Sequence, residues 1–333
     1  MFLKHLHILR CPVTKRPLKL IKKRANGERV QEGILVEPLS GVSYPIIQYV
    51  PRFTAGDSYT ASFSFEWSMH HNTQYDTAIE KSSHKRFVHE TGWPYSLKGQ
   101  NILEVGSGSG RFTREALKTS ATVVSFDYSQ SVSMNYLHNG RHPNLLIVQA
   151  DVYAMPFQTE YFDKVFCFGV LQHTPNPRLA FLNMLSSLTP GGEIVSDIYI
   201  KNIYRYVLEP KYWVRPITTR IAPHTLYRAV KRYIDIMWPL ASLIRKIPRI
   251  GPTINWKLLI ADHSRDLTQP TDEALREWAY LDTMDMLSPT YDTPQTYTEF
   301  RRWHTDAGLS NISIQTGYNG LVGRAKKTPL SQS

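Results

Sequence analysis

The sequence predicts an α/β fold built on a doubly wound, mostly parallel β-sheet. Short apolar runs recur between residues 101 and 199, helix-length segments separate them, and most of the runs end on a glycine or an aspartate. A parallel sheet needs this alternation, because a crossover helix must carry the chain back to the start of each next strand. In such sheets the ligands lie along the carboxyl ends of the strands.

The first predicted strand, Ile102–Val105, runs directly into a loop with glycine at positions 106, 108 and 110. Glycine has no Cβ, so a ligand can approach the backbone N–H groups closely, and the predicted helix Phe112–Lys118 points its positive end toward the loop. In the dinucleotide pattern G-x-G-x-x-G the third glycine comes one residue later, where this chain has Arg111. The spacing argues against NAD and FAD. Two interpretations of the loop remain: it binds another nucleotide-like cofactor, or it is only a tight strand-to-helix turn.

The following strands have the same form. Asp127 ends the second strand, where a carboxylate can accept the hydroxyls of a ribose. Asp151 and Gly169 end the third and fourth strands, and a turn at residues 190–192 leads into the fifth. These four predicted strands are Ala121–Phe126, Leu145–Ala150, Phe162–Phe168 and Glu193–Tyr199.

Five segments of the chain carry a family resemblance. They are Glu104–Gly110, Phe126–Ser129, Ala150–Pro156, Phe162–His173 and Leu188–Glu193. In this order they resemble the motifs of class I S-adenosylmethionine-dependent methyltransferases, and the methyltransferase type 11 group in particular. The resemblance implies a seven-stranded Rossmann-like sheet, with Asn311–Gln315 as the sixth strand and an antiparallel Gly320–Arg324 as the seventh. It also implies S-adenosyl-L-methionine as the cofactor.

The resemblance implies which residues face the methionine part of the cofactor. The loop backbone would lie along it, Glu104 would lie near the amine, and the Phe168 carbonyl would accept from the same amine. Phe168 could instead be an ordinary core aromatic. The loop residues are Gly106, Ser107, Gly108 and Gly110.

The adenosine part is assigned in the same way. Asp127 would bind the ribose, and Tyr128 would lie against the adenine, where a flat apolar face is favourable. Asp151 would accept from the adenine amino group, with the Val152 backbone beside it. Tyr128 could also be a core aromatic.

His173 is the candidate general base. A sulfonium methyl is already an activated electrophile, so a hydroxyl acceptor needs alignment, exclusion of water and removal of its proton. His173 follows the fourth strand on the cofactor side of the sheet, and imidazole suits proton removal near neutral pH. The alternative is that its ring only caps a backbone group or shapes the cofactor pocket.

Residues 1–55 are predicted to form a small β-rich domain of short strands and turns. The segment resembles the zinc-ribbon-like accessory domain that precedes some methyltransferase cores. Where that fold carries C-x-x-C pairs, this chain has Cys11 with Thr14, and Glu37 with Ser40. One thiolate cannot complete a structural zinc site, so no metal is expected, and Cys11 is predicted to be a small buried side chain. The predicted strands lie within Ile8–Leu18, Gly33–Val36, Gly41–Ile47 and Val50–Phe53.

Residues 56–98 resemble the cap helices that often precede such cores, with helical stretches at Ser62–Trp67 and Thr73–Asp76. These helices would close over the cofactor, and Trp67 is a candidate acceptor contact. The alternative is an extended segment whose aromatic residues pack on one face. The predicted core comprises residues 99–200 and 294–327, followed by a tail at 328–333.

Residues 201–293 are predicted to be a helical insertion that acts as a substrate lid. Residues 201–252 contain eleven Lys and Arg against two acids, and prolines are expected to break this part into short helices. The charge suggests an anionic acceptor, an anionic membrane surface or an RNA backbone as partner, unless it is only a solvated face. The other candidate acceptor contacts are Tyr199, Tyr291 and Asp292, with Asp282 and Asp285 as secondary ones that could also only cap turns.

The composition sets further bounds. The chain has 333 residues, 42% hydrophobic content and a formal net charge of +11. Its two cysteines, Cys11 and Cys167, cannot form a disulfide framework. No stretch approaches the roughly 20 apolar residues that cross a bilayer, and the start lacks an uninterrupted apolar region. We therefore expect a cytoplasmic protein.

Together these observations predict an S-adenosylmethionine-dependent methyltransferase. The predicted reaction is in-line methyl transfer to an oxygen of a small or carrier-linked anionic acceptor. Two alternatives stay open: a methyltransferase that acts on RNA such as tRNA, and a non-catalytic module that binds the cofactor or a partner.

Overall fold

The computed structural model describes residues 1–54, 59–70, 73–77, 80–201 and 208–329. The chain forms two compact units. The core unit consists of Met1–Asp57, Arg86–Ile200 and Tyr291–Ser333, and the helical unit of Ser58–Lys85 and Lys201–Thr290. The N-terminal segment thus belongs to the same unit as the central sheet, and the predicted cap segment is divided between the two units. Most of the predicted tail lies outside the described residues, as do residues 202–207 of the insertion.

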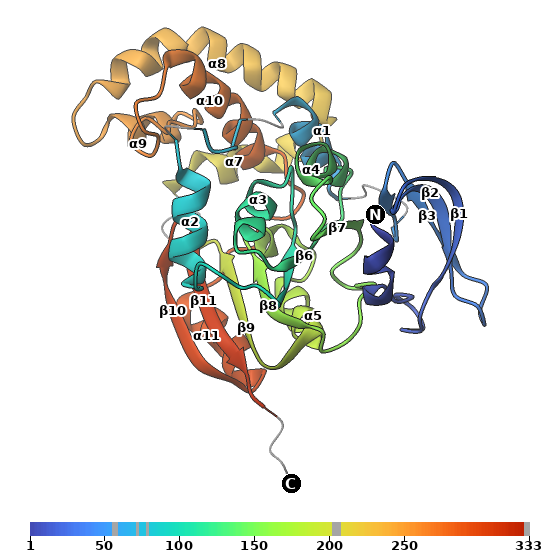
Figure 1. The fold of residues 1–333 in the computed structure, drawn as a ribbon. Coiled ribbons are helices and arrows are strands. Elements are labelled where there is room, and N and C mark those ends of the chain that lie inside the picture. Colours follow the sequence, from blue (N-terminus) through green and yellow to red (C-terminus); the bar gives the residue numbers. More distant parts are fainter. Residues whose placement is uncertain (55–58, 71–72, 78–79, 202–207, 330–333) are drawn as a thin grey trace. The chain divides into compact units, whose positions relative to one another are not determined.

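The core unit is built on a seven-stranded sheet with the order β10-β11-β9-β8-β5-β6-β7 (Figure 1). Strands β5 to β9 are parallel, and β11 is antiparallel to both of its neighbours. This confirms the predicted doubly wound sheet and its antiparallel last strand. The strands are β5 Asn101–Val105, β6 Thr122–Asp127, β7 Leu145–Gln149, β8 Phe162–Cys167, β9 Leu188–Ile198, β10 Leu309–Gly317 and β11 Gly320–Lys327.

Both faces of the central sheet are buried. On β5, Ile102 packs into one hydrophobic cluster and Leu103 into the other, and β8 divides Val165 and Phe166 in the same way. Successive side chains of a strand point to opposite faces, so a strand covered on both sides appears as the continuous apolar run seen in the sequence. The helices of this layer are α3 Arg111–Lys118, α4 Val132–Asn139, α5 Pro177–Ser187 and α11 Tyr297–Asp306.

Strand β9 differs from its prediction. It begins at Leu188, before the predicted turn, and its pairing with β8 jumps from Phe162↔Leu188 to Lys164↔Glu193. Residues 190–192 therefore form a bulge within the strand, where Pro190 cannot donate to the ladder and Gly191 has a φ of 80°.

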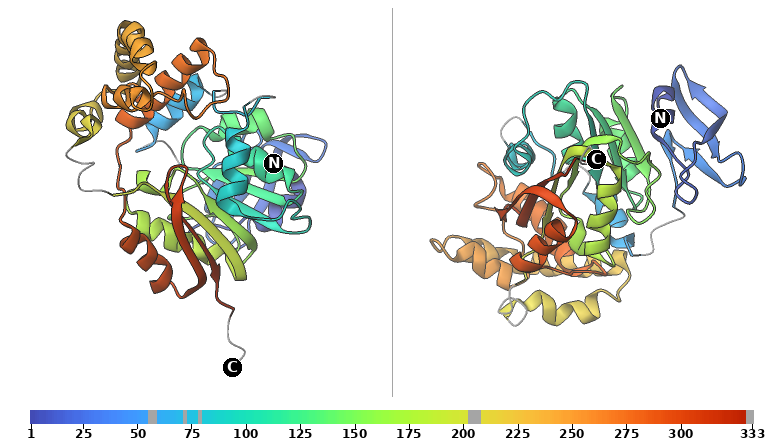
Figure 2. Two further views of the ribbon diagram at one scale, coloured as in Figure 1. Left: turned by 90° about the vertical axis from the view of Figure 1, so that its left-hand side faces the viewer. Right: turned by 90° about the horizontal axis from the view of Figure 1, so that it is seen from below.

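The N-terminal residues form a separate four-stranded antiparallel sheet with the order β1-β2-β3-β4, preceded by the 3₁₀ helix η1 Leu3–Ile8 (Figures 1 and 2). Strand β1 was not predicted, because it is an exposed strand without apolar alternation. The turn that joins β1 to β2 consists of Gly27 and Glu28, and the available signal was Gly27, whose φ of 57° suits a tight hairpin turn. The strands are β1 Lys19–Asn26, β2 Arg29–Val36, β3 Ser43–Ile47 and β4 Val50–Pro51.

The helical unit contains α1 Ala61–Met69, α7 Pro210–Thr218, α8 Pro223–Arg245, α9 Gly251–Lys257 and α10 Asp272–Leu287. Helix α2, Ser82–Thr91, begins in this unit and ends in the core unit. The prediction of short helices broken by prolines is wrong for α8, which continues through Pro239. One lost hydrogen bond is offset here by the packing of an extensive apolar face on the same helix.

The predicted cap segment is helical only in part. Ser62–Trp67 lies in α1, so the extended alternative is wrong, but Thr73–Asp76 is not a helix. Its last residue instead stabilises the start of α2, since the Asp76 carboxylate accepts from Ser83 N at 2.8 Å and from His84 N at 2.9 Å. Among the helices of the described residues, none combines the length and the apolar content needed to span a membrane.

Candidate active site

The loop after β5 requires its glycines. Gly106, Gly108 and Gly110 have φ values of 78°, 52° and 96°, which side chains disfavour. A Cβ on Gly106 would lie 2.2 Å from Val170 Cγ2. Gly106 N and Ser107 N both donate to Phe126 O, at 2.8 and 3.1 Å, so the loop is held against the end of β6. The N–H groups of Gly106 and Ser107 are thus used within the fold, and the role of the loop as a cofactor cradle stays a prediction.

Asp127 joins the glycine loop to the next loop. Its Oδ2 accepts from Gly108 N at 2.8 Å, and its Oδ1 accepts from Ser129 N at 2.8 Å and Ser129 Oγ at 2.7 Å. The carboxylate therefore lies at the carboxyl end of β6, where the sequence places it. Its role toward a ribose stays a prediction.

Glu104 lies in a buried polar network behind the glycine loop. Its side chain is 1% exposed, and its Oε2 accepts from Ser125 Oγ at 2.7 Å and from Thr113 Oγ1. Burial raises the pKa of Glu104 to about 7, although both hydroxyl groups act to lower it. These contacts tie Glu104 to α3 and β6 behind the glycine loop. That Glu104 lies near the methionine amine of the cofactor stays a prediction.

The network continues from Glu104 to the end of the loop. Asn135 Nδ2 donates to Thr113 Oγ1 at 2.9 Å and to Ser125 Oγ at 3.0 Å, and Asn139 Nδ2 donates to Gly110 O at 3.0 Å. These side chains come from α3, β6 and α4. Their contribution was not predicted, because scattered polar residues on three elements give no sequence pattern.

The residues predicted for the adenosine part follow β6 and β7. Asp151 is half-buried, and its Oδ1 accepts from Tyr153 N at 2.8 Å. Burial raises the pKa of Asp151, with the Tyr153 N–H opposing the shift. Val152 is buried, and the Tyr128 carbonyl accepts from Gln149 Nε2 at 3.0 Å. The end of β7 is thus tied to the loop that follows β6, beside Asp127.

An arginine of the N-terminal segment contacts the end of β7, the loop after β6 and the start of α4. Arg52 Nη1 donates to Gln149 Oε1 at 2.6 Å and Gln130 Oε1 at 2.7 Å, and its Nη2 donates to Ser133 Oγ at 2.9 Å. This link between the N-terminal sheet and the predicted cofactor end was missed. A lone arginine after a strand gives no signal in the sequence.

The end of β8 is positioned by a buried ion-pair cluster. Gly169 N donates to Asp197 Oδ1 at 2.6 Å, and Arg86 pairs with Asp197 and, through Nε at 2.9 Å, with Glu90 Oε2. The Arg86 guanidinium carbon lies 5.6 Å from the centroid of the Phe168 ring. Burial raises the pKa of Asp197 to about 6, against the opposing effect of Arg86. The sequence signal for this cluster was Asp197, an acid inside an otherwise apolar strand. A buried carboxylate needs a cation or hydrogen-bond donor as its partner.

The structure brings three predicted acceptor-site residues together. His173, in the 3₁₀ helix η2 Leu171–His173, is 7% exposed, and its ring meets that of Tyr199 edge-on with centroids 5.4 Å apart. His173 Nδ1 lies 2.9 Å from Tyr291 O. A carbonyl only accepts, so Nδ1 carries the proton and Nε2 of the neutral ring carries the lone pair. Asp292 follows Tyr291 in the same segment, whereas Trp67 belongs to α1 of the helical unit.

Residues 103–196 match the family model of the methyltransferase domain. This part of the core unit is a methyltransferase domain. The chain is similar to a tRNA U34 carboxymethyltransferase of Nautilia profundicola, with 28% identity over 32% of this chain and 36% of that protein. It is also similar to a ubiquinone biosynthesis O-methyltransferase of Coxiella burnetii, with 27% identity over 34% of this chain and 49% of that protein.

A solved structure of a candidate S-adenosyl-L-methionine-dependent methyltransferase from Methanococcus maripaludis aligns with a TM-score of 0.44 and 16% identity, covering 84% of this chain and 99% of that one. The chain spans less than half the length of the two relatives above. The family match thus concerns the methyltransferase domain and not the acceptor.

Gln172 is a further candidate site residue, next to the predicted base His173 in η2. Its side chain is fully buried beside His173, and neither amide atom has a hydrogen-bond partner among the described atoms. Its carbonyl, by contrast, accepts from both N and Oγ1 of Thr293 at 2.9 Å. A buried amide without partners is costly unless a ligand or water satisfies it. This orphaned amide and the glycine cradle both fit a methyltransferase that binds a polar cofactor here.

The N-terminal segment contains the positions at which the predicted zinc-ribbon-like fold would carry cysteines. Cys11 is buried, as predicted, with Sγ 3.4 Å from Tyr44 Oη. The Glu37 carboxylate accepts from Leu39 N at 3.0 Å and from Ser40 N at 2.9 Å. Within the described ranges, no group of three or more His, Cys, Asp or Glu side chains is arranged to hold a metal ion. The zinc-ribbon-like assignment stays a prediction.

Proposed function

We propose that the chain transfers a methyl group in line to an oxygen of a small or carrier-linked anionic acceptor. The observation that carries the proposal is the histidine of the methyltransferase domain whose hydrogen bond to Tyr291 O leaves Nε2 as the proton acceptor. It lies directly after the loop that follows β8, at the carboxyl end of the parallel strands. Ligands of doubly wound sheets bind at this end. A cytoplasmic location stays a prediction.

S-adenosyl-L-methionine, when bound, supplies an already activated sulfonium methyl. The loop from Gly106 to Gly110 would hold the methionine part through its backbone, with the carbonyl of Phe168 accepting from the amine. Asp127 would accept from the ribose, while Tyr128, Asp151 and Val152 would border the adenine. The glycine cradle, which no Cβ can enter at Gly106, supports this assignment.

His173 would remove the proton of an acceptor hydroxyl through Nε2. Tyr199 and Tyr291 would border the acceptor, since the ring of one and the carbonyl of the other contact this imidazole. Asp292 would lie in the same segment. Because the methyl is already activated, alignment and proton removal are the chemistry that side chains must supply.

An RNA acceptor is the second candidate. One of the relatives is named for tRNA, and the chain carries a formal net charge of +11. Such an enzyme would bind RNA with an affinity that falls steeply as salt rises. Labelled methyl transfer into cell extract, with and without ribonuclease treatment, distinguishes the two: loss of the labelled product after ribonuclease would favour RNA over a small acceptor.

The cofactor site is tested by titrating S-adenosyl-L-methionine against wild type and Asp127→Ala. We expect the variant to bind at least about tenfold more weakly, as for loss of a charged hydrogen bond of about 1.4 kcal/mol or more. Asp163→Ala is the matched control, because Asp163 Oδ2 also accepts from a backbone N–H, Asn101 N at 2.8 Å, but at the amino end of β5. Wild type that binds no cofactor, or equal loss in both variants, would refute the assignment.

The base is tested with His173→Gln. We expect methyl transfer to fall by about 100-fold or more, the usual contribution of a general base, while cofactor affinity stays within a few-fold of wild type. Transfer that survives with weaker cofactor binding would instead make His173 a residue that only shapes the pocket.

A further inference from the structure

Helix α8 of the helical unit has two apolar faces. Its inner face packs into the hydrophobic core of that unit against α10, which runs beside it in Figure 1. The residues of this face are Leu226, Tyr227, Val230, Ile234, Trp238 and Ala241, all at most 7% exposed. This face accounts for the fold of the unit, since most helical stability comes from such packing.

The outer face of α8 is exposed although it is aliphatic. Ile236, Leu240 and Leu243 are 68%, 46% and 63% exposed, and their spacing of four and three residues places them on one side of the helix. Tyr233, one turn earlier on this side, is 38% exposed. Beyond the helix end, Ile247 and Ile250 are also exposed, at 41% and 54%. A contiguous exposed apolar stripe of this kind marks an interaction site.

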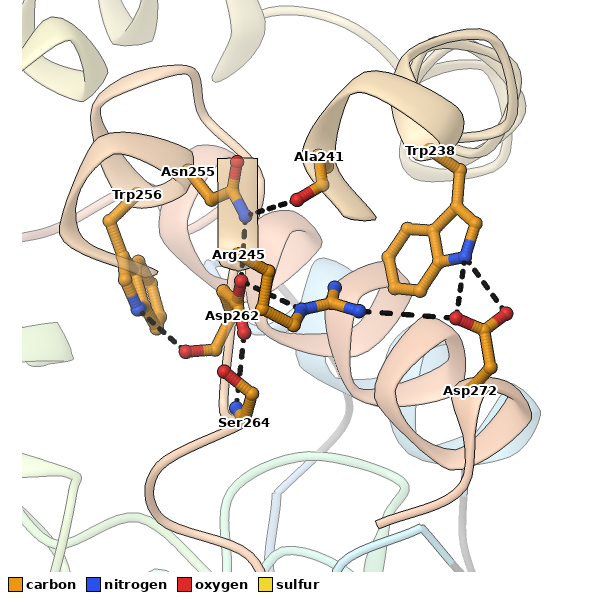
Figure 3. Close-up of polar contacts among 8 residues, drawn as sticks. All are labelled: Trp238, Ala241, Arg245, Asn255, Trp256, Asp262, Ser264 and Asp272. Carbon is orange, nitrogen blue, oxygen red and sulfur yellow. Dashed lines mark hydrogen bonds and ion pairs between the residues drawn. The ribbon is translucent and has the colours of Figure 1, made fainter. Parts of the chain in front are cut away.

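The inner side of α8 is fixed by polar contacts, so its outer face is presented by a rigid helix. Arg245 Nε contacts Asp262 Oδ2 at 3.0 Å, and Trp238 Nε1 donates to both Asp272 oxygens at 3.1 and 3.0 Å (Figure 3). Asn255 Nδ2 donates to the same Asp262 oxygen at 2.6 Å. Burial would raise the pKa of Asp262, but hydrogen bonds from Asn255, Ser264 and Arg245 outweigh the effect of burial and hold this pKa below its usual value.

Cations flank the aliphatic stripe. Arg232 and Arg228 are exposed and lie one and two turns before Ile236, and Lys246 and Arg249 are exposed just beyond the helix. Residues 210–250 hold nine Lys and Arg and a single acid, Asp235, which pairs with Arg276 at 2.8 Å. The surface therefore combines exposed aliphatic side chains with an excess of positive charge.

We infer that the outer face of α8 binds the surface of an anionic lipid bilayer. An interfacial helix buries aliphatic side chains at the boundary of headgroups and acyl chains while its Lys and Arg meet anionic headgroups. The stripe on α8 supplies the first element and the flanking cations supply the second. The helix is too polar to span the bilayer, so it lies in the plane of the interface.

Two other occupants fit the face less well. Single-stranded RNA stacks its bases on aromatic rings, and this face offers Tyr233, whereas Ile236, Leu240 and Leu243 are aliphatic and more exposed than Tyr233. A second copy of the chain would bring two sets of like charges together without acids to neutralise them. An anionic lipid surface accounts for both the exposed aliphatic side chains and the one-sided charge.

The test is co-sedimentation of the full chain with vesicles of phosphatidylcholine alone and of phosphatidylcholine mixed with phosphatidylglycerol. We expect binding to the mixed vesicles, little binding to the neutral ones, and weaker binding at high salt. Absence of binding to the mixed vesicles overturns the inference.

Two sets of variants separate the apolar from the electrostatic contribution. Leu240→Glu with Leu243→Glu should weaken binding at least about tenfold, because carboxylates replace buried methylenes and repel anionic lipid. The matched control is Leu137→Glu with Leu179→Glu, two helical leucines of the core unit that are 66% and 44% exposed. Equal loss in both pairs overturns the inference.

Two further variants each remove three cations, one from the region of α8 and one, the control, from β1. Arg228→Gln, Arg232→Gln and Lys246→Gln together should weaken binding to mixed vesicles at least about tenfold, at roughly 1 kcal/mol per cation. The control removes Lys22, Lys23 and Arg24, which are exposed on β1. Circular dichroism confirms folding, and Leu240→Gln with Leu243→Gln replaces the glutamate pair if that pair does not fold.

Further readouts distinguish the rival occupants. Light scattering after gel filtration would overturn the inference if wild type were a dimer that the leucine pair made monomeric. The inference would also be overturned if the chain bound single-stranded RNA through Arg228, Arg232 and Lys246 but did not bind the mixed vesicles. A wild-type monomer that binds mixed vesicles through both the leucines and the cations supports it.

Discussion

Gly106 shows how one missing Cβ shapes the cofactor loop. Its φ of 78° and the 2.2 Å approach to Val170 Cγ2 act together, so conformation and space both exclude a side chain. Gly191 offers a comparison, with a φ of 80° and open space within 4 Å of the position that a Cβ would take. Comparing an alanine substitution at each position therefore separates the free-energy cost of the left-handed backbone from the cost of the clash with Val170.

Gly106→Ala should destabilise the protein by about 3 kcal/mol or more and abolish cofactor binding. The left-handed conformation costs about 1–2 kcal/mol, and the overlap with Val170 adds strain of about 1–3 kcal/mol. Gly191→Ala should cost only the first contribution and leave cofactor binding unchanged. Urea unfolding and cofactor titration measure both effects, and equal losses in the two variants would contradict the role given to Val170.

Glu104 predicts a pH dependence of stability. Its carboxyl has a pKa of about 7 in the folded chain against an ordinary value of 4.5, so the folded state favours the protonated form. This contribution to stability is fully present below about pH 4.5 and is lost as the pH rises through about 7, in total about 3 kcal/mol. Glu104→Gln, which cannot ionise, should flatten the dependence of the unfolding free energy on pH in this window. An unchanged slope would show that folding leaves the pKa of Glu104 near its ordinary value.

At the scale of elements, an ion-pair cluster joins α2 to β9. Arg86 of α2 contacts Asp197 of β9 and Glu90 of its own helix, and the two acids are both fully buried. Because Asp197 also accepts from Gly169 N, the cluster fixes the loop that leads to His173. The polar core of this element pair thus supports the candidate site without being part of it.

Arg86→Ala should destabilise the chain by about 3–5 kcal/mol, since it leaves two buried carboxylates without their cation. Arg178→Ala is the control, because Arg178 and Asp306 form an exposed pair at 3.1 Å whose loss should cost less than about 1 kcal/mol. Thermal unfolding compares the two variants. Similar losses would mean that the buried cluster is not stabilised by its arginine.

The elements also show what the sequence could predict. Strands β5 to β8 were found because a strand buried on both faces appears as an apolar run, and their ends placed Asp127 and His173. Strand β1 was missed because its side chains are exposed, and α8 was divided wrongly because a proline penalty is local while the packing that offsets it is not. The partners of Glu104 could not be predicted, since three elements supply them only after folding.

At the scale of the whole molecule, the N-terminal sheet and the methyltransferase domain belong to one compact unit. Arg52 links the two at the ends of β6 and β7, while Arg10 links them elsewhere, through Nη2 to Gln158 Oε1 at 2.7 Å. The N-terminal sheet therefore supports the loops assigned to the adenosine part, although no metal group of its own was found among the described residues.

This arrangement predicts that Arg52→Ala weakens S-adenosyl-L-methionine binding while Arg10→Ala does not. Arg52 donates to Gln149 at the end of β7, to Gln130 in the loop after β6 and to Ser133 at the start of α4. Its loss unties these three segments, which must then be ordered when the cofactor binds. An added ordering cost of about 1.4 kcal/mol corresponds to a tenfold loss of affinity. Arg10→Ala removes the hydrogen bond to Gln158 but leaves the three hydrogen bonds of Arg52 in place. Isothermal titration of both variants decides the matter, because equal affinities would mean that the N-terminal sheet stabilises the fold without preparing the cofactor site.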